Sequence, residues 1–256
     1  MSDPQDIQSL FQDAHTEGVL SQAAFQSLDV HDLGVQIQAG LGIEVDDVMS
    51  SEIVLVTIMP DDSGSIRYSS NAQAVRGGHN AILDALDQCP QKDEILIHNR
   101  YLNGTVLYPY CFLNQAVRMT PQNYDPRLGT PLYDQSLVLL GTVLAKAQEF
   151  SDNGVPVRTI TLLITDGADV SSQRATAKDI KAVVDDMLKA ENHTIAAMGI
   201  DDGGATDFRQ VFREMGIRDE WVLTPGQGEQ EIRQAFQLFS QSAVQVSQAA
   251  GKLSGF

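Results

Sequence analysis

The chain has 256 residues, of which 43% are hydrophobic and 20% are charged, and its formal net charge is −17. This length allows one α/β domain with a small extension, and the composition is that of a folded protein rather than a disordered one. A surface this acidic repels phosphate backbones and anionic lipids, which argues against nucleic acid or a membrane as the main partner. Divalent cations or a basic protein face fit the charge better.

The start of the sequence contains neither the basic segment nor the apolar segment of a secretory signal. Apolar runs such as 138–145 are too short to span a bilayer. The two cysteines, Cys89 and Cys111, form neither a disulfide framework nor a zinc set, which favours a reducing compartment. We therefore expect a cytoplasmic protein.

The first 50 residues are the most acidic part of the chain, with nine Asp or Glu and no Lys or Arg. Asp3 and Pro4 have the pattern of a helix start. The apolar residues that follow share one helical face: Ile7, Leu10, Phe11 and Ala14. A second short helix is expected at 21–28, and a strand-like alternation at 33–37 is too short to assign. We interpret 1–50 as an N-terminal extension that either covers an edge of the next domain or serves a second partner, including another copy of the chain.

From residue 52, predicted strands alternate with predicted helices. The strands are expected at 52–59, 93–102, 105–113, 158–165, 194–200 and 220–224. The helices are expected at about 70–89, 131–150, 175–191, 206–215 and 232–246. The Asn103-Gly104 pair predicts a hairpin between the second and third strands. This order predicts an α/β fold with a doubly wound, mostly parallel sheet, one antiparallel edge strand and helices on both faces. We assign this domain to 51–250 and expect a loose tail at 251–256.

Hydroxyl and carboxylate residues lie where the predicted parallel strands end. Asp61, Ser63 and Ser65 follow the first strand, Asp166 follows the strand at 158–165, and Thr130 precedes the helix at 131. Ligands of such sheets bind at the carboxyl ends of the strands. Oxygen ligands from Ser, Thr and Asp suit a hard cation such as Mg²⁺. The sequence therefore predicts a metal site at this edge.

The D-x-S-x-S run at 61–65, the G-T-P-L run at 129–132 and the T-D-G turn at 165–167 resemble the metal-ion-dependent adhesion site (MIDAS) of von Willebrand factor A (vWA) domains. The resemblance extends over about residues 52–245, and the three elements occur in the family's order. It implies a metal site with Mg²⁺, or alternatively Mn²⁺ or Ca²⁺, at Asp61, Ser63, Ser65, Thr130 and Asp166. It also implies that the three hydroxyls bind the metal directly, that the aspartates act largely through water, and that a partner protein adds a Glu or Asp carboxylate. The sequence departs from the common D-G-S-G-S run at Asp62.

With the expected compartment, the resemblance indicates an intracellular vWA protein of bacterial type. Such a protein is expected to be a binding module without catalytic residues. Adaptor or scaffold roles beside a MoxR-type AAA+ ATPase, or in a stress or defence assembly, are typical of this group. We expect Asp61→Ala or Thr130→Ala to remove metal-dependent binding without unfolding the domain, because both residues are predicted in surface loops.

A metal-dependent phosphate-ester hydrolase of the haloacid-dehalogenase type is the alternative, because that class also places an Asp after the first strand. It requires a second acid two residues later, where this chain has Ser63. It also requires a lysine near the later acids Asp166 and Asp169, and the nearest one is Lys178. The five histidines have no metal-ligand spacing. We therefore expect a protein that is not an enzyme.

Overall fold

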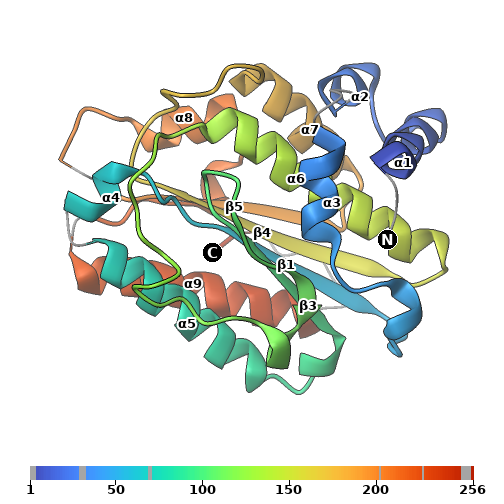
Figure 1. Ribbon diagram of the computed structural model, residues 1–256, viewed down its shortest axis with the longest axis horizontal. Helices are drawn as coiled ribbons and strands as arrows, with labels where there is room; N and C mark the ends of the chain where they lie inside the picture. The colour runs from blue at the N-terminus through green and yellow to red at the C-terminus, as the bar shows by residue number, and fades with distance from the viewer. Residues whose placement is uncertain (1–3, 29–32, 69–70, 202, 227, 249–254) are drawn as a thin grey trace.

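The computed structural model forms a three-layer α/β arrangement, with one sheet between two layers of helices (Figure 1). The structure describes residues 4–28, 33–68, 71–201, 203–226, 228–248 and 255–256. The strands are Ile53–Met59 (β1), Ile95–Arg100 (β2), Val106–Phe112 (β3), Val157–Thr165 (β4), His193–Gly199 (β5) and Val222–Leu223 (β6). The α-helices are Pro4–Thr16 (α1), Gln22–Leu28 (α2), Leu33–Leu41 (α3), Gly64–Tyr68 (α4), Asn71–Asp87 (α5), Leu132–Asp152 (α6), Ala177–Lys189 (α7), Phe208–Glu214 (α8) and Glu229–Gln248 (α9). Short 3₁₀ turns are Val45–Asp47 (η1), Lys92–Glu94 (η2), Leu113–Gln115 (η3) and Asp219–Trp221 (η4).

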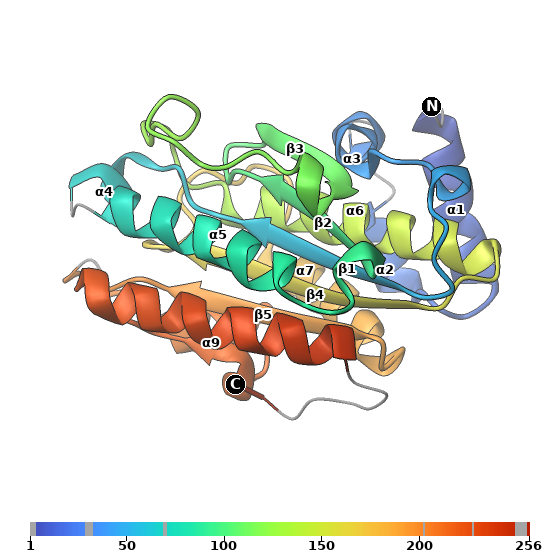
Figure 2. The same ribbon diagram turned by 90° about the horizontal axis from the view of Figure 1, so that it is seen from below.

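The sheet order is β3-β2-β1-β4-β5-β6, and only the β2–β3 pair is antiparallel. The predicted doubly wound sheet with one antiparallel edge strand is therefore confirmed. Helices α5 and α9 lie side by side on one face (Figure 2), and α6 and α7 cover the other. Every residue of β1 is buried, as its continuous apolar sequence predicts for a strand covered on both faces.

The edge strand β3 is less buried than the central strands. Its residues range from buried Tyr110 to exposed Pro109, and a proline on an edge strand blocks pairing with another chain.

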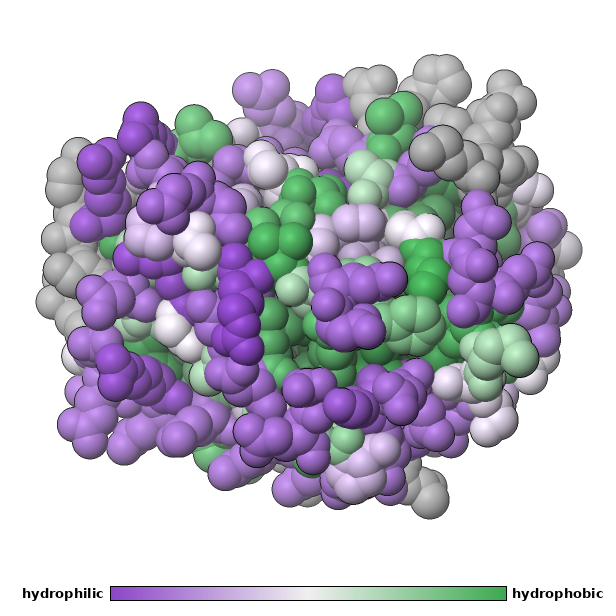
Figure 3. Space-filling view, turned by 60° about the horizontal axis from the view of Figure 1, so that its bottom comes forward, coloured by the Kyte–Doolittle hydropathy of each residue, from purple (hydrophilic) through white to green (hydrophobic). Residues whose placement is uncertain are grey.

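On the face drawn in Figure 3, hydrophobic side chains reach the surface in a band across the middle, and hydrophilic residues surround the band. No helix in the described part of the chain is both long and apolar enough to cross a membrane.

The N-terminal helices pack onto the α6–α7 side of the domain and share its core. Ile7 and Phe11 of α1 are buried, which favours the covering role of this segment over self-association through that face. The alternation at 33–37 belongs to a helix, α3, because Leu33, Ile37 and Leu41 at i, i+4 and i+8 are buried while Val35 is exposed.

Two predicted terminal features fall partly or wholly outside the described residues. Asp3, the expected start of the first helix, lies outside the described residues, and so do residues 251–254 of the expected tail. At the end of the chain, the ring of Phe256 lies 5.1 Å from that of Trp221 in an edge contact. The Phe256 N–H also donates to the Glu220 carbonyl at 3.2 Å.

A glycine sets the close approach of α5 and α9. A Cβ added at Gly78 would lie 2.1 Å from the Phe236 ring, and Phe236 is itself buried. The neighbouring Gly77 has open space around the same position.

We expect Gly78→Ala to lower the free energy of unfolding by about 1–3 kcal/mol, because the new methyl group overpacks the helix interface. The matched variant Gly77→Ala should instead raise it by up to about 1 kcal/mol, since alanine is the better helix residue where space permits. Urea unfolding of both variants measures the difference. Equal stabilisation by the two substitutions would contradict the close packing.

Candidate metal centre

The carboxyl ends of β1 and β4 bring the predicted metal-site residues to one edge of the sheet. The two strands are adjacent and parallel, and Met59 pairs with Leu163. The loop that follows β1 and the residue that follows β4 therefore start side by side. This register places Asp61, Ser63 and Ser65 next to Asp166.

Backbone hydrogen bonds attach the loop that carries Thr130 to the same edge. Ser63 forms a parallel bridge with Leu128, and the Gly64 N–H donates to the Leu128 carbonyl at 3.0 Å. On its other side, the Thr130 carbonyl accepts from the Val170 N–H at 3.2 Å. The chain segment with Thr130 thus lies between the β1 loop and the loop after Asp166.

Three side-chain oxygens converge at the centre of this arrangement. The Ser63 and Ser65 hydroxyls are 2.9 Å apart. Both approach one oxygen of Asp166, with Ser65 Oγ donating to Asp166 Oδ1 at 2.7 Å and Ser63 Oγ at 3.4 Å. Two hydroxyls and a carboxylate oxygen within hydrogen-bond distance form a compact set of hard donors.

Asp61 is buried behind these oxygens and organises the loop. Its Oδ1 accepts from the Ser63 N–H at 2.7 Å. Its Oδ2 accepts from Thr165 Oγ1 at 2.8 Å and from the Asp166 N–H at 3.3 Å. Burial raises the pKa of Asp61 above its ordinary value, although its hydrogen bonds act in the opposite direction.

The expectation that Asp61 and Thr130 lie in surface loops is wrong for their side chains. Asp61 is 0% exposed and Thr130 is 6% exposed. Replacing Asp61 by alanine would leave the Ser63 and Asp166 N–H groups without an acceptor, which typically costs about 1–3 kcal/mol for each such group, whereas the Thr165 hydroxyl could still donate to the Gly167 carbonyl at 2.9 Å. Loss of stability after Asp61→Ala therefore reports on the loop as much as on a metal.

Asp62, where the sequence departs from the common glycine, has a structural role that sequence reasoning missed. Its carboxylate accepts from the Asn103 N–H at 2.9 Å and from the Asn103 side-chain amide. The contact fixes the metal-site loop to the β2–β3 turn, where Gly104 has a φ of +93°. Burial raises the pKa of Asp62 to about 6, with a contribution from the charge of Asp61.

The donor set fits a hard divalent cation. In the described part of the chain, no group of three or more His, Cys, Asp or Glu residues is placed to hold a metal ion. The cluster at the strand ends is instead built from hydroxyls with two aspartates. Neutral oxygen donors leave more of the cation's charge available for an outside anion than a cage of carboxylates does.

The residues required by the hydrolase alternative do not assemble here. Ser63 occupies the position of the second acid. The Asp169 carboxylate instead accepts from the Tyr133 N–H at 3.3 Å and from the Ser172 hydroxyl at 2.5 Å. The geometry therefore does not favour phosphate-ester hydrolysis.

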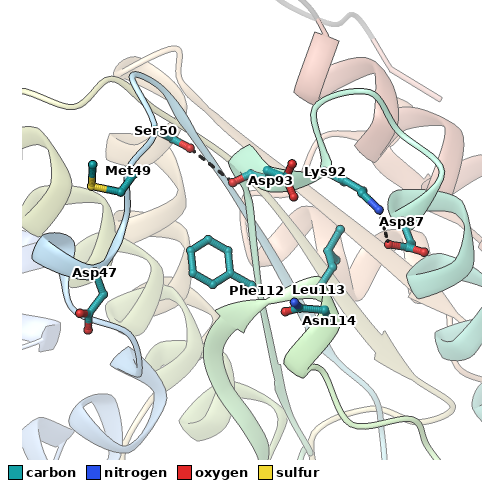
Figure 4. Close-up of a pocket in the computed structure, with 9 residues that line it drawn as sticks. All are labelled: Asp47, Met49, Ser50, Asp87, Lys92, Asp93, Phe112, Leu113 and Asn114. Carbon is teal, nitrogen blue, oxygen red and sulfur yellow. Dashed lines mark hydrogen bonds and ion pairs between the residues drawn. The ribbon is translucent and has the colours of Figure 1, made fainter.

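A hollow of about 420 Å³ lies at the opposite end of the sheet, near the start of β1 and β2 (Figure 4). The Phe112 side chain projects into it between Met49 and Leu113, and Asp87 forms an ion pair with Lys92 at 3.2 Å on its border. On the same border the Ser50 hydroxyl donates to the Asp93 backbone carbonyl at 3.3 Å.

No family model and no curated protein matches this sequence. Solved structures do match its fold. The vWF domain of the type V pili tip protein Mfa5 from Porphyromonas gingivalis is 13% identical, with a TM-score of 0.53, and the match covers 81% of this chain and 100% of that one. The pilus adhesin SpaC from Lactobacillus rhamnosus GG is 13% identical, with a TM-score of 0.55, and the match covers 77% of this chain and 30% of that one.

Proximal thread matrix protein 1 from the mussel byssus is 18% identical, with a TM-score of 0.50, and the match covers 77% of this chain and 48% of that one. The chain thus corresponds to less than half of the adhesin and of the mussel protein. At these identities the likeness concerns the fold alone. The order of the strands, the helices on both faces and the match to a complete vWF domain agree, and the chain has a vWA-type fold.

Proposed function

We propose that this chain is a protein-binding module that uses a divalent metal, held by Asp61, Ser63, Ser65, Thr130 and Asp166, to capture a partner's carboxylate. The observation that carries the proposal is the convergence of the Ser63 and Ser65 hydroxyls on Asp166 at the carboxyl edge of the sheet. Two of the matched proteins are a pilus adhesin and a pilus tip protein, which supports a binding role.

The residues of the cluster would have different roles in binding the ion. The hydroxyls of Ser63, Ser65 and Thr130 supply neutral oxygens, and the carboxylate of Asp166 supplies charge. The bound ion would provide an electrophilic centre for an anionic side chain from outside. Asp61 would orient the loop through the hydrogen bonds described above, so that the hydroxyls stay together.

The proposal includes Mg²⁺ as the ion, with Mn²⁺ or Ca²⁺ as alternatives, and a cytoplasmic adaptor or scaffold role. A MoxR-type AAA+ ATPase is the partner class that the family resemblance implies. Retention of such a protein from source-cell lysate in Mg²⁺ but not in EDTA would support this assignment. Identical retention under both conditions would contradict it.

We expect Ser65→Ala to weaken Mg²⁺ binding by about tenfold or more, while the melting temperature changes little. Ser65 is exposed, so the substitution removes a donor oxygen without emptying the core. Isothermal titration of the full chain with MgCl₂ and MnCl₂ measures the affinity.

Ser151→Ala is the matched control, because Ser151 is an exposed serine near the end of α6 and lies outside the site. It should bind metal as the unmodified chain does. Equal metal affinity of the Ser65→Ala and Ser151→Ala chains would rule out the hydroxyl cluster as the metal site.

A further inference from the structure

Two exposed aliphatic side chains border the candidate metal centre. Val170 is 77% exposed and Leu128 is 56% exposed, whereas most large hydrophobic residues of the described chain are buried. Each belongs to a loop that also carries a metal-site residue, Leu128 two positions before Thr130 and Val170 four positions after Asp166. Exposed hydrophobic side chains around a polar centre are typical of binding surfaces.

The backbone at both positions is held against the site. The Leu128 carbonyl accepts from Gly64 at 3.0 Å, and the preceding residue, Arg127, donates from its N–H to the Asp62 carbonyl at 3.0 Å. The Val170 N–H donates to the Thr130 carbonyl at 3.2 Å. A binding surface that is ordered in advance loses less conformational entropy on association. These two side chains are therefore presented at fixed places beside the hydroxyl cluster.

Positive charge lies on the same border, although the chain as a whole is strongly acidic. The exposed Arg127 side chain forms an ion pair with Asp125. Arg67, exposed on α4, is close enough to lower the pKa of Asp125 together with Arg127. These three exposed side chains together carry a net positive charge, which favours an approaching carboxylate at this border.

We infer that the partner presents its carboxylate on a segment in which an aliphatic or aromatic side chain stands next to the Asp or Glu. This inference rests on the proposed function and specifies the ligand of the same site. The carboxylate would face the metal and the hydroxyl cluster. The apolar neighbour would cover Leu128 or Val170 and remove apolar surface from water. Acidic segments with only polar neighbours would leave both side chains exposed and bind more weakly.

Selection of peptides on the full chain tests the inference. A phage-displayed library of random dodecapeptides is bound in MgCl₂ and eluted with EDTA, and the enriched peptides are synthesised for titration. We expect them to contain Asp or Glu beside Leu, Ile, Val or Phe. Their Kd should rise about tenfold with Leu128→Ser or Val170→Ser, since each substitution removes an apolar contact.

Met49→Ser is the matched control, because Met49 is 97% exposed but borders the hollow at the opposite end of the sheet. It should leave the Kd unchanged. Two outcomes would overturn the inference while the proposed function stands. One is enrichment of magnesium-dependent acidic peptides without an apolar preference, and the other is a Kd that neither Leu128→Ser nor Val170→Ser changes. A selection in which EDTA elutes no enriched peptides, while acid elution of the same resin does, would contradict the proposed function, and the inference with it.

Discussion

A chain that lacks residues 1–48 is expected to lose cooperative folding. The missing segment contributes apolar side chains that are at most 8% exposed: Ile7, Phe11, Ala14, Leu20, Ala24, Leu28, Leu33, Ile37 and Leu41. Burial of each large member contributes about 1.5–3 kcal/mol. Without the segment, α6 and α7 would expose the apolar surface that α1, α2 and α3 now contact. Thermal unfolding followed by circular dichroism should show no sharp transition in the shortened chain.

Polar contacts add to this expectation, because two buried cations use carbonyl groups of the N-terminal segment. Arg100 of β2 donates to the Gln36 carbonyl, and Lys146 of α6 donates to the Ile43 carbonyl. Lys146 also pairs with Glu149 at 2.9 Å. Burial lowers the pKa of Arg100 to about 10 and lowers that of Lys146. Deleting the segment would remove these acceptors and leave charged groups under-satisfied.

A matched pair of point substitutions on α3 tests the same packing in the intact chain. Ile37 is 0% exposed, and its side chain packs at Gly141 of α6. Ile37→Ala should therefore lower the free energy of unfolding by about 2–5 kcal/mol. Val35, which is 61% exposed on the same helix, should tolerate alanine within about 0.5 kcal/mol.

A shortened chain that melts within a few degrees of the full chain would show that the extension is not needed for folding.

The central sheet could be predicted from the sequence because β1 and β4 are continuous apolar runs between turn signals. A continuous apolar run is typical of a strand buried on both faces, whereas the segments between the strands repeat their apolar residues at the spacing of an amphipathic helix. Helix α3 could not be assigned in the same way. Its apolar residues fit both a period of two and a spacing of four over so few positions, and the contact with α6 at Gly40 and Gly141 decides between them.

The position of the candidate site follows from a rule about strand ends, but the roles of its residues do not. The spacing of Asp61, Ser63 and Asp166 predicts that they meet, because parallel strands end at the same edge. It does not predict that the Asp61 carboxylate is fully buried, since burial depends on donors more than 100 positions away, at Thr165 and Asp166. Nor does it predict the contact of Asp62 with Asn103, which joins two loops across the sheet edge.

Lowering the pH from 7.5 to 5.5 is expected to destabilise the folded chain, because three buried histidines resist protonation. Burial lowers the pKa of His79 to about 4, of His98 to about 3 and of His193 to about 4. Nearby Arg118 and Arg100 contribute to the shifts of His79 and His98 respectively.

In the unfolded chain each histidine binds a proton near pH 6.5. The stabilisation from keeping them neutral is thus complete above pH 6.5, and it is lost as the pH falls from 6.5 towards 4. The loss between pH 7.5 and 5.5 is about 1 kcal/mol per histidine, or a few kcal/mol for the three.

The two aspartates of the metal-site loop act in the opposite direction. Because the pKa of Asp62 is raised to about 6 and that of Asp61 is also raised, the folded chain takes up protons more readily than the unfolded chain at these groups. Their contribution therefore makes the folded state relatively more stable as the pH falls, and it offsets part of the histidine effect. Working in EDTA keeps metal binding out of the comparison.

A single histidine variant separates these contributions. His193 is buried at the start of β5, and its ring pairs with the Thr159 hydroxyl at 2.8 Å, far along the chain from both aspartates. His193→Gln removes one titrating group and leaves the opposing aspartates in place. Urea unfolding at pH 7.5 and 5.5 should therefore show a loss of stability that is about 1 kcal/mol smaller in the variant than in the unmodified chain. Equal losses in the two chains would mean that His193 takes up its proton in the folded state, and burial would then not control its charge.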